Sequence, residues 1–180
     1  MRRFLFFIVA LLFVIPVLGQ GSSEKIHEFN STIDIQKSGA IIVKEEIYYD
    51  FGYSYRHGIY RDIPQIVYRE NNNKYVLDYK VRSVMAENGR QYKYTLLHEN
   101  NYLRIKIGDP DRTITGPHIY IITYEVKGAL NYFNDHTELY WNSTGDQWDV
   151  PIDSARTTVI LPQVVTGPDI KVACYTGAHG

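Results

Sequence analysis

Two segments of the chain gather side chains that could bind a ligand or catalyse a reaction. The first, residues 56–65, reads RHGIYRDIPQ. In a binding interpretation, Arg56 and Arg61 offer planar guanidinium groups to a carboxylate or a phosphate, and Tyr60 supplies a ring on which a ligand can stack. The residue types of this segment therefore favour a recognition loop for an anionic or planar group.

The same segment also supports a structural interpretation, which we favour. Gly58 allows a sharp turn of the backbone, and the isoleucines of the segment then point inward. In this arrangement Arg61 pairs across the end of the domain with an acid such as Asp146 or Asp149. The two interpretations are compatible, because an arginine-lined and aromatic end of a domain is also a plausible interaction surface.

The second segment, residues 133–152, concentrates acidic residues beside both tryptophans of the chain. Glu138 and Asp146 could act as the acid and the base of a glycosidase, with Trp141 and Trp148 as stacking platforms for a sugar. Alternatively, the acids lie on a polar loop and the tryptophans close the open end of a β-sandwich. The spacing along the sequence does not decide between a hydrolase and a structural loop.

Other kinds of catalytic and metal site find little support in the sequence. No serine lies in a Gly-x-Ser-x-Gly context, and the six histidines are scattered without a familiar metal-ligand spacing. The loop DPDRTITG, which starts at Asp109, resembles a calcium loop but lacks the acidic ligand at its far end. We therefore expect neither a metal nor another cofactor.

Composition narrows the class of partner and the class of fold. The 19 basic and 20 acidic residues leave a formal net charge of -1 on 180 residues, so there is no electrostatic case for a nucleic-acid partner. Tyrosine, present 16 times, favours β-strands and can keep its hydroxyl in water while its ring packs. The composition therefore indicates an all-β domain.

Alternating apolar residues predict a series of strands joined by short turns. Gly39 lies in the turn of a long hairpin, and Asn88-Gly89 is the strongest hairpin signal in the chain. This spacing is typical of an antiparallel β-sandwich of the immunoglobulin-like type. The predicted strands cover residues 29–35, 41–51, 75–81, 92–96, 103–107, 120–126, 155–162 and 169–175.

The two ends of the chain indicate its compartment. Residues 1–19 combine two arginines, a short apolar run and a small-residue cleavage pattern, as in a cleaved secretory signal peptide. Residues 20–180 then form one exported domain. Cys174, the single cysteine, falls in the apolar phase of the last predicted strand, where a structural role is expected. We expect the domain to be truncated at its C-terminal edge, with any disulfide partner beyond Gly180.

Several motifs together resemble the family of bacterial and archaeal predicted membrane proteins known as domain of unknown function 2207. These motifs are IVKEEIYYDF, HGIYRDIP, GPHIYIITYEVKGAL, ELYWNSTGDQWDVPI, VILP and CYTGAHG, and they cover nearly all of the mature chain. The resemblance implies an extracytoplasmic β-sandwich that follows a signal peptide and precedes one or more membrane spans. It implies no catalytic residue.

We therefore predict a non-catalytic, extracytoplasmic domain of a membrane-anchored protein that binds or scaffolds at the cell envelope. The membrane anchor would lie beyond this chain, and the partner would be a protein or a glycan at the cell surface. An envelope polysaccharide hydrolase that uses Glu138 and Asp146 is the alternative, and a purely structural domain is a third. The expected contact residues are Arg56, Tyr60, Arg61, Tyr140, Trp141 and Trp148.

Overall fold

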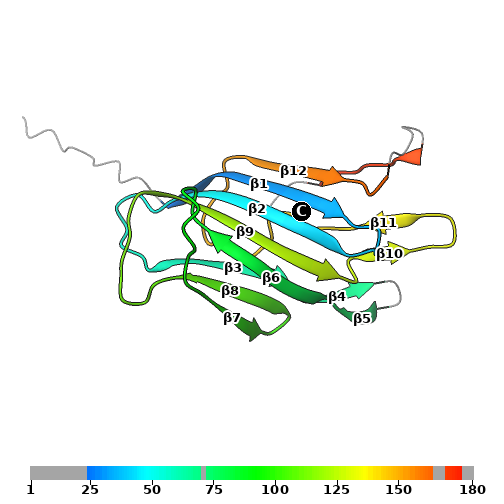
Figure 1. The fold of residues 1–180 in the computed structure, drawn as a ribbon, viewed down its shortest axis with the longest axis horizontal. Coiled ribbons are helices and arrows are strands. Elements are labelled where there is room, and N and C mark those ends of the chain that lie inside the picture. The colour runs from blue at the N-terminus through cyan, green and yellow to red at the C-terminus, as the bar shows by residue number, and fades with distance from the viewer. Residues whose placement is uncertain (1–23, 70–71, 164–168, 176–180) are drawn as a thin grey trace, which may run out of the picture.

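Two β-sheets face each other across one apolar core (Figure 1). The computed structural model describes residues 24–69, 72–163 and 169–175. The larger sheet has five strands, in the spatial order β12 (Ala155–Ile160), β1 (Lys25–Ile35), β2 (Ile41–Asp50), β9 (Pro117–Lys127) and β6 (Asp78–Met85).

The second layer of the sandwich is a three-stranded antiparallel sheet. Its spatial order is β3 (Gly58–Pro64), β8 (Tyr102–Gly108) and β7 (Tyr94–Glu99). Two small hairpins lie together at one end of the sandwich, at the right of Figure 1. They consist of β4 (Ile66–Arg69) with β5 (Asn73–Val76), and β10 (Leu130–Tyr132) with β11 (Thr137–Leu139).

The core follows from strict alternation along the central strands. On β2, Ile41, Val43 and Ile47 are buried while Lys44 and Tyr48 face solvent, as the two-residue period of a strand requires. Burial of each isoleucine side chain contributes about 1.5–3 kcal/mol relative to its exposure. The predicted all-β sandwich is therefore confirmed.

The predicted hairpin between the first two strands is also confirmed. Gly39 adopts a φ of 83°, which an L-residue rarely tolerates, and the register pairs Ile35 with Ile41. A backbone hydrogen bond from Gln36 N to Ala40 O at 2.8 Å closes the turn.

The chain reverses at Asn88-Gly89 as predicted, but the two arms pair only next to the turn. They are joined there by the bridge between Met85 and Gln91 and by two backbone hydrogen bonds, from Ala86 N to Arg90 O and from Tyr92 N to Val84 O. Beyond it, β6 pairs with β9 in the larger sheet, while β7 pairs with β8 in the smaller one. A turn sequence determines the local reversal of the chain and does not determine which sheet the second arm joins.

Three further expectations are corrected. Residues 58–64, which we expected to form a corner, are strand β3. β1 and β12 run parallel, so the larger sheet is not wholly antiparallel. Residues 169–175 form no strand, and Cys174 among them is exposed instead of packed in a core. Their apolar alternation lacks a neighbouring strand in the described part of the chain to pair with.

The predicted signal peptide, residues 1–19, and the chain end at Gly180 lie outside the described residues. Across the described ranges, no helix combines the length and the apolar character that a bilayer span needs.

Candidate functional site

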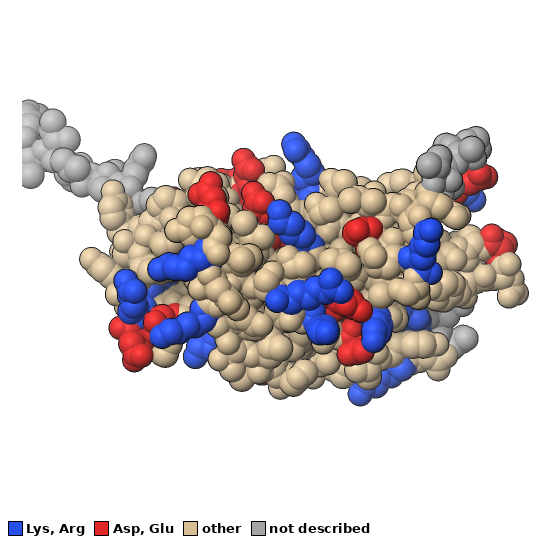
Figure 2. All heavy atoms as spheres, viewed as in Figure 1, with Lys and Arg blue, Asp and Glu red and all other residues tan. Residues whose placement is uncertain are grey.

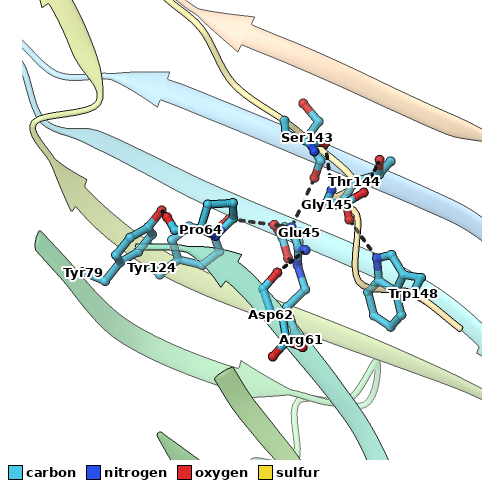
Figure 3. Close-up of polar contacts among 11 residues, drawn as sticks. Glu45, Arg61, Asp62, Pro64, Tyr79, Tyr124, Ser143, Thr144, Gly145 and Trp148 are labelled. Carbon is cyan, nitrogen blue, oxygen red and sulfur yellow. Dashed lines mark hydrogen bonds and ion pairs between the residues drawn. The ribbon is translucent and has the colours of Figure 1, made fainter. Parts of the chain in front are cut away.

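A buried ion pair joins the two sheets at the centre of the sandwich (Figure 3). Arg61 on β3 donates from Nε and Nη2 to the two carboxylate oxygens of Glu45 on β2, at 2.8 and 2.7 Å. Arg61 is 1% exposed and Glu45 is 0% exposed. Both residues occupy core-facing positions of their strands, so the alternation of each strand places one charge inside.

The remaining hydrogen-bonding groups of the pair are largely satisfied. Tyr124 on β9 donates its hydroxyl to Glu45 Oε1 at 2.6 Å. Arg61 also donates to the backbone oxygens of Asp62 at 2.9 Å and Ser143 at 3.3 Å. The buried charges are therefore embedded in a network, which is the condition under which such a pair is tolerated in a core.

Electrostatics keep the buried guanidinium protonated. Burial alone lowers the pKa of Arg61, but the charge and hydrogen bonds of Glu45 raise it, and the net pKa lies above the ordinary value. Burial and the neighbouring Glu45 carboxylate together raise the pKa of Tyr124 well above its usual range. Tyr124 therefore remains a neutral hydroxyl donor.

The structure supports the structural interpretation of Arg61 but not the partner that we predicted. Asp146 and Asp149 were the expected acids, and that expectation is wrong because Arg61 points into the core, where its carboxylate partner is Glu45. Asp146 instead accepts hydrogen bonds from the Tyr102 hydroxyl on β8, at 3.1 and 3.3 Å.

The segment 142–148 covers the guanidinium from the open side of the sandwich, as Figure 3 shows. Gly145 adopts a φ of +80°, and a Cβ atom built there would collide with Nη1 of Arg61. Trp148 donates from Nε1 to Thr144 O at 2.7 Å, and its ring centroid lies 5.9 Å from the guanidinium carbon. Trp141 and Trp148, the two tryptophans that we expected to be contact residues, both pack against the core.

Arg56 and Tyr60 lie apart from this network. Arg56 is exposed and pairs with Glu24, with Nη2 at 2.7 Å from Oε1. Tyr60 lies on the outer face of β3, under the guanidinium of Arg104, whose central carbon is 5.0 Å from the ring centroid. Arg104 in turn donates to both carboxylate oxygens of Asp62, at 2.7 and 2.8 Å.

A groove of about 570 Å³ lies between the two small hairpins at the end of the sandwich. We call it the aromatic groove because seven of its sixteen lining residues carry rings. Two of the predicted contact residues, Tyr140 and Trp141, are among them. The ring-bearing lining residues are Tyr68, Tyr75, Tyr79, Tyr132, Phe133, Tyr140 and Trp141.

Besides the tyrosine hydroxyls, the described polar lining of the aromatic groove comprises three asparagines and one residue of each charge. Arg69 donates to the backbone oxygen of Gly128, and its guanidinium carbon lies 4.4 Å from the ring centroid of Tyr75. Glu138 accepts a hydrogen bond from Asn131 Nδ2 at 3.3 Å. Both charged side chains are therefore engaged within the protein.

Two lining residues contribute buried polar atoms that have no hydrogen-bond partner. These atoms are Oδ1 of Asn131, an acceptor, and Nε1 of Trp141, a donor. Leaving a buried donor or acceptor unpaired costs about 1–3 kcal/mol, so such atoms commonly indicate a missing water or ligand.

The structure does not bring the two candidate hydrolase carboxylates into one groove. Glu138 lines the aromatic groove, whereas Asp146 is not among the lining residues and is hydrogen-bonded to Tyr102. In the loop that resembles a calcium loop, Asp109 forms an ion pair with Lys93 at 2.7 Å. Among the described residues, no three histidine, cysteine or acidic side chains are arranged to hold a metal ion.

Opposite charges are interspersed over the face of the sandwich in Figure 2. Several basic side chains have an acidic partner, as in the contacts of Lys25 with Asp153 and of Arg82 with Glu125. The distribution agrees with the near-neutral composition.

The sequence indicates some residues of the buried ion pair and of the aromatic groove, but it does not indicate which residues come together in each. A charged residue in the core phase of a strand is the signal for the ion pair, and it is present twice with opposite sign, at Glu45 and Arg61. The contributions of β4, β5 and β10 to the aromatic groove were missed, because those strands are too short for a reliable alternation.

Comparison with known proteins shows the family to which the chain belongs. A family model described as "Predicted membrane protein (DUF2207) N-terminal domain" matches residues 25–179. The chain therefore belongs to this family of predicted membrane proteins, as its motifs indicated. It is 27% identical over 159 residues to "Uncharacterized protein YciQ" of Escherichia coli (strain K12), a match that covers 87% of this chain and 25% of that protein. The chain thus spans about a quarter of the length of that relative, and neither description assigns a catalytic activity.

Solved structures show only a partial likeness. The native leukotriene A4 hydrolase of Saccharomyces cerevisiae matches with a TM-score of 0.45 and 12% identity, over 62% of this chain and 17% of that one. A non-cellulosomal cohesin from Archaeoglobus fulgidus matches with a TM-score of 0.31 and 14% identity, over 78% of this chain and 91% of that one. At these scores neither likeness bears on function.

Proposed function

We propose that the chain is an extracytoplasmic, non-catalytic binding domain of a membrane-anchored envelope protein, and that the aromatic groove is its contact surface. The observation that carries this proposal is the groove itself, a hollow of about 570 Å³ whose lining is rich in rings. The family's description as a predicted membrane protein supports the anchoring, and the signal-like residues 1–19 support the export.

The exposure of the rings favours binding over packing. Tyr140 is 72% exposed and Tyr132 is 70% exposed, although both line the groove. Tyrosine supplies a large, stiff contact area with few rotatable bonds, which is why it is enriched where proteins recognise ligands. A cluster of exposed rings around a hollow therefore has the composition of a contact surface.

The buried arginine also holds the loop that follows the groove residues Tyr140, Trp141 and Asn142. Arg61 donates to the backbone oxygen of Ser143, and Asn142, which lines the groove, accepts a hydrogen bond from Gly145 N at 3.0 Å. Residues 140–142 therefore enter a loop that the core arginine holds. The HGIYRDIP segment braces the loop that carries Tyr140 and Trp141, which gives the arginine a structural role in a binding domain.

The hydrolase alternative is less well supported. A glycosidase needs two carboxyl groups within about 5–9.5 Å on opposite sides of one bond. Among the described lining residues Glu138 is the single carboxylate, and it accepts a hydrogen bond from Asn131. A Glu138→Gln variant that retains binding, with no glycan cleavage by either form, would assign the groove to recognition alone.

Sedimentation with insoluble bacterial envelope material tests the binding role. The wild-type chain, Tyr140→Ala and Tyr53→Ala are compared, because Tyr53 is a similarly exposed tyrosine, at 79%, outside the groove. Wild type and Tyr53→Ala should sediment, and Tyr140→Ala should bind at least about tenfold more weakly. If none sediments, or all three sediment equally, the proposed function is wrong.

A further inference from the structure

We infer that the aromatic groove binds a neutral oligosaccharide segment of an envelope polysaccharide. This inference rests on the proposed function and specifies the chemical class of its ligand. The described lining of the groove combines ring faces, side-chain amides and one charged residue of each sign. A sugar chain presents the three complementary features, namely apolar C–H faces, closely spaced hydroxyl groups and no net charge.

The ring faces account for the apolar part of the recognition. One face of a pyranose ring carries several C–H bonds, and it packs flat against an aromatic ring. Tyr68 and Tyr75 reach the groove from β4 and β5, while Tyr132 reaches it from β10 on the other side. Tyr140 follows β11. Rings from separate strands on both sides of one hollow suit a chain of several sugar units better than a single compact ligand.

The amides account for the polar part. Asn73, Asn131 and Asn142 line the groove, and an amide both donates and accepts hydrogen bonds, as does each sugar hydroxyl. The unpaired atoms, Oδ1 of Asn131 and Nε1 of Trp141, are one acceptor and one donor. A hydroxyl group, directly or through a bound water, can satisfy an atom of either kind.

The charges disfavour an ionic ligand. Among the described lining residues, Arg69 and Glu138 carry the charges, one of each sign, and each has a hydrogen-bond partner within the protein. A phosphate or carboxylate ligand would share the groove with the Glu138 carboxylate, which repels it, while Arg69 already donates to the carbonyl oxygen of Gly128 and lies against the ring of Tyr75. A neutral ligand meets no such repulsion, so the electrostatics of the groove favour a sugar chain over a lipid headgroup or an acidic peptide.

Competition with defined sugars tests the ligand class. Chitohexaose, cellohexaose and maltohexaose are added at rising concentration to the wild-type chain bound to envelope material, with sucrose at equal mass as the control for viscosity. In parallel, the envelope material is digested with a protease or with a muramidase before use. At least one hexasaccharide should release the chain, muramidase should remove most of the binding, and protease should leave it within about twofold.

The outcomes separate this inference from the proposed function. If binding depends on Tyr140 but is abolished by protease and unaffected by all three hexasaccharides, the ligand is a protein. The groove would then remain the contact surface, and the glycan inference would be wrong. If the hexasaccharides release wild type and Tyr140→Ala at the same concentrations, the sugar binds outside the groove, which also overturns the inference.

Discussion

Glu45 and Arg61 form a two-point ion pair inside the sandwich, with N–O distances of 2.7 and 2.8 Å and no appreciable exposure of either side chain. One residue comes from each sheet, so the pair fixes how the sheets face each other as well as holding them together. An apolar core alone specifies relative position less sharply, because apolar contacts lack direction.

Removing one partner of this pair should destabilise the fold strongly. Arg61→Met leaves the Glu45 carboxylate buried without its cation, and we expect the free energy of unfolding to fall by about 3–5 kcal/mol. The double variant Glu45→Leu with Arg61→Met removes both charges, so it should recover most of that loss. Urea unfolding followed by tryptophan fluorescence measures both. A double variant as unstable as the single would show that the hydrogen bonds to the loop, and not the charge pairing, dominate.

The close approach of Arg61 to Gly145 should make an alanine at Gly145 more destabilising than an alanine at a matched glycine elsewhere. Gly145 and Gly89 have φ values of +80° and +78°, but only at Gly145 would a Cβ meet Arg61, while at Gly89 it meets nothing within 4 Å. Gly89→Ala should therefore cost about 1–2 kcal/mol from backbone strain alone. Gly145→Ala should cost about 1–3 kcal/mol more, because the buried arginine must shift. Equal losses in thermal or urea unfolding would argue against a tightly packed loop.

Two tyrosines on the core face of β9 should respond oppositely to loss of their hydroxyl group. Tyr124 donates to the Glu45 carboxylate, so Tyr124→Phe should lower the free energy of unfolding by about 1.5–3 kcal/mol. The hydroxyl of Tyr120 is buried with no partner, so Tyr120→Phe should be neutral or stabilising by about 1 kcal/mol. Urea unfolding of both variants checks this, and a destabilised Tyr120→Phe would indicate a bound water at its hydroxyl.

Alkaline pH should destabilise the domain through the same rings. Burial raises the pKa of Tyr120 above its ordinary value of 10. Its contribution to stability is therefore complete below pH 10 and is lost as the pH rises from there toward the folded-state pKa, by about 1.4 kcal/mol per pH unit. Tyr120→Phe should flatten the fall in the free energy of unfolding between pH 10 and 12. A slope for Tyr120→Phe identical to that of the wild type would contradict this assignment.

The sequence predicts the fold well where the alternation is long. The β1–β2 hairpin and strands β8 and β9 follow directly from their apolar periods. Arg61 interrupts the apolar period of β3, and an arginine is normally assigned to the surface, so the sequence does not predict this strand. Glu45 interrupts the apolar period of β2 in the same way, and two such interruptions of opposite charge are the sequence signal for the buried pair.

The aromatic groove could be predicted only in part. Tyr140 and Trp141 were expected to make contacts because they lie in a segment without alternation. Tyr68, Tyr75 and Tyr132 come from short strands that are distant in the sequence, and only the packing of the two small hairpins brings them to one hollow. Trp148, although close to Trp141 along the chain, turns inward to cover Arg61.

The two tryptophan indole groups provide the most direct measurement of whether the groove binds a sugar chain. Trp141 lines the groove and its buried Nε1 has no hydrogen-bond partner, whereas Nε1 of Trp148 donates to Thr144 in the loop over the core. A ¹H–¹⁵N spectrum of the chain, assigned with a Trp141→Phe variant, is recorded during titration with each of the three hexasaccharides. We predict a saturable shift of the Trp141 indole signal with at least one of them, and an unchanged Trp148 signal. No shift with any of the three, or equal shifts of both signals, would contradict a glycan-binding groove.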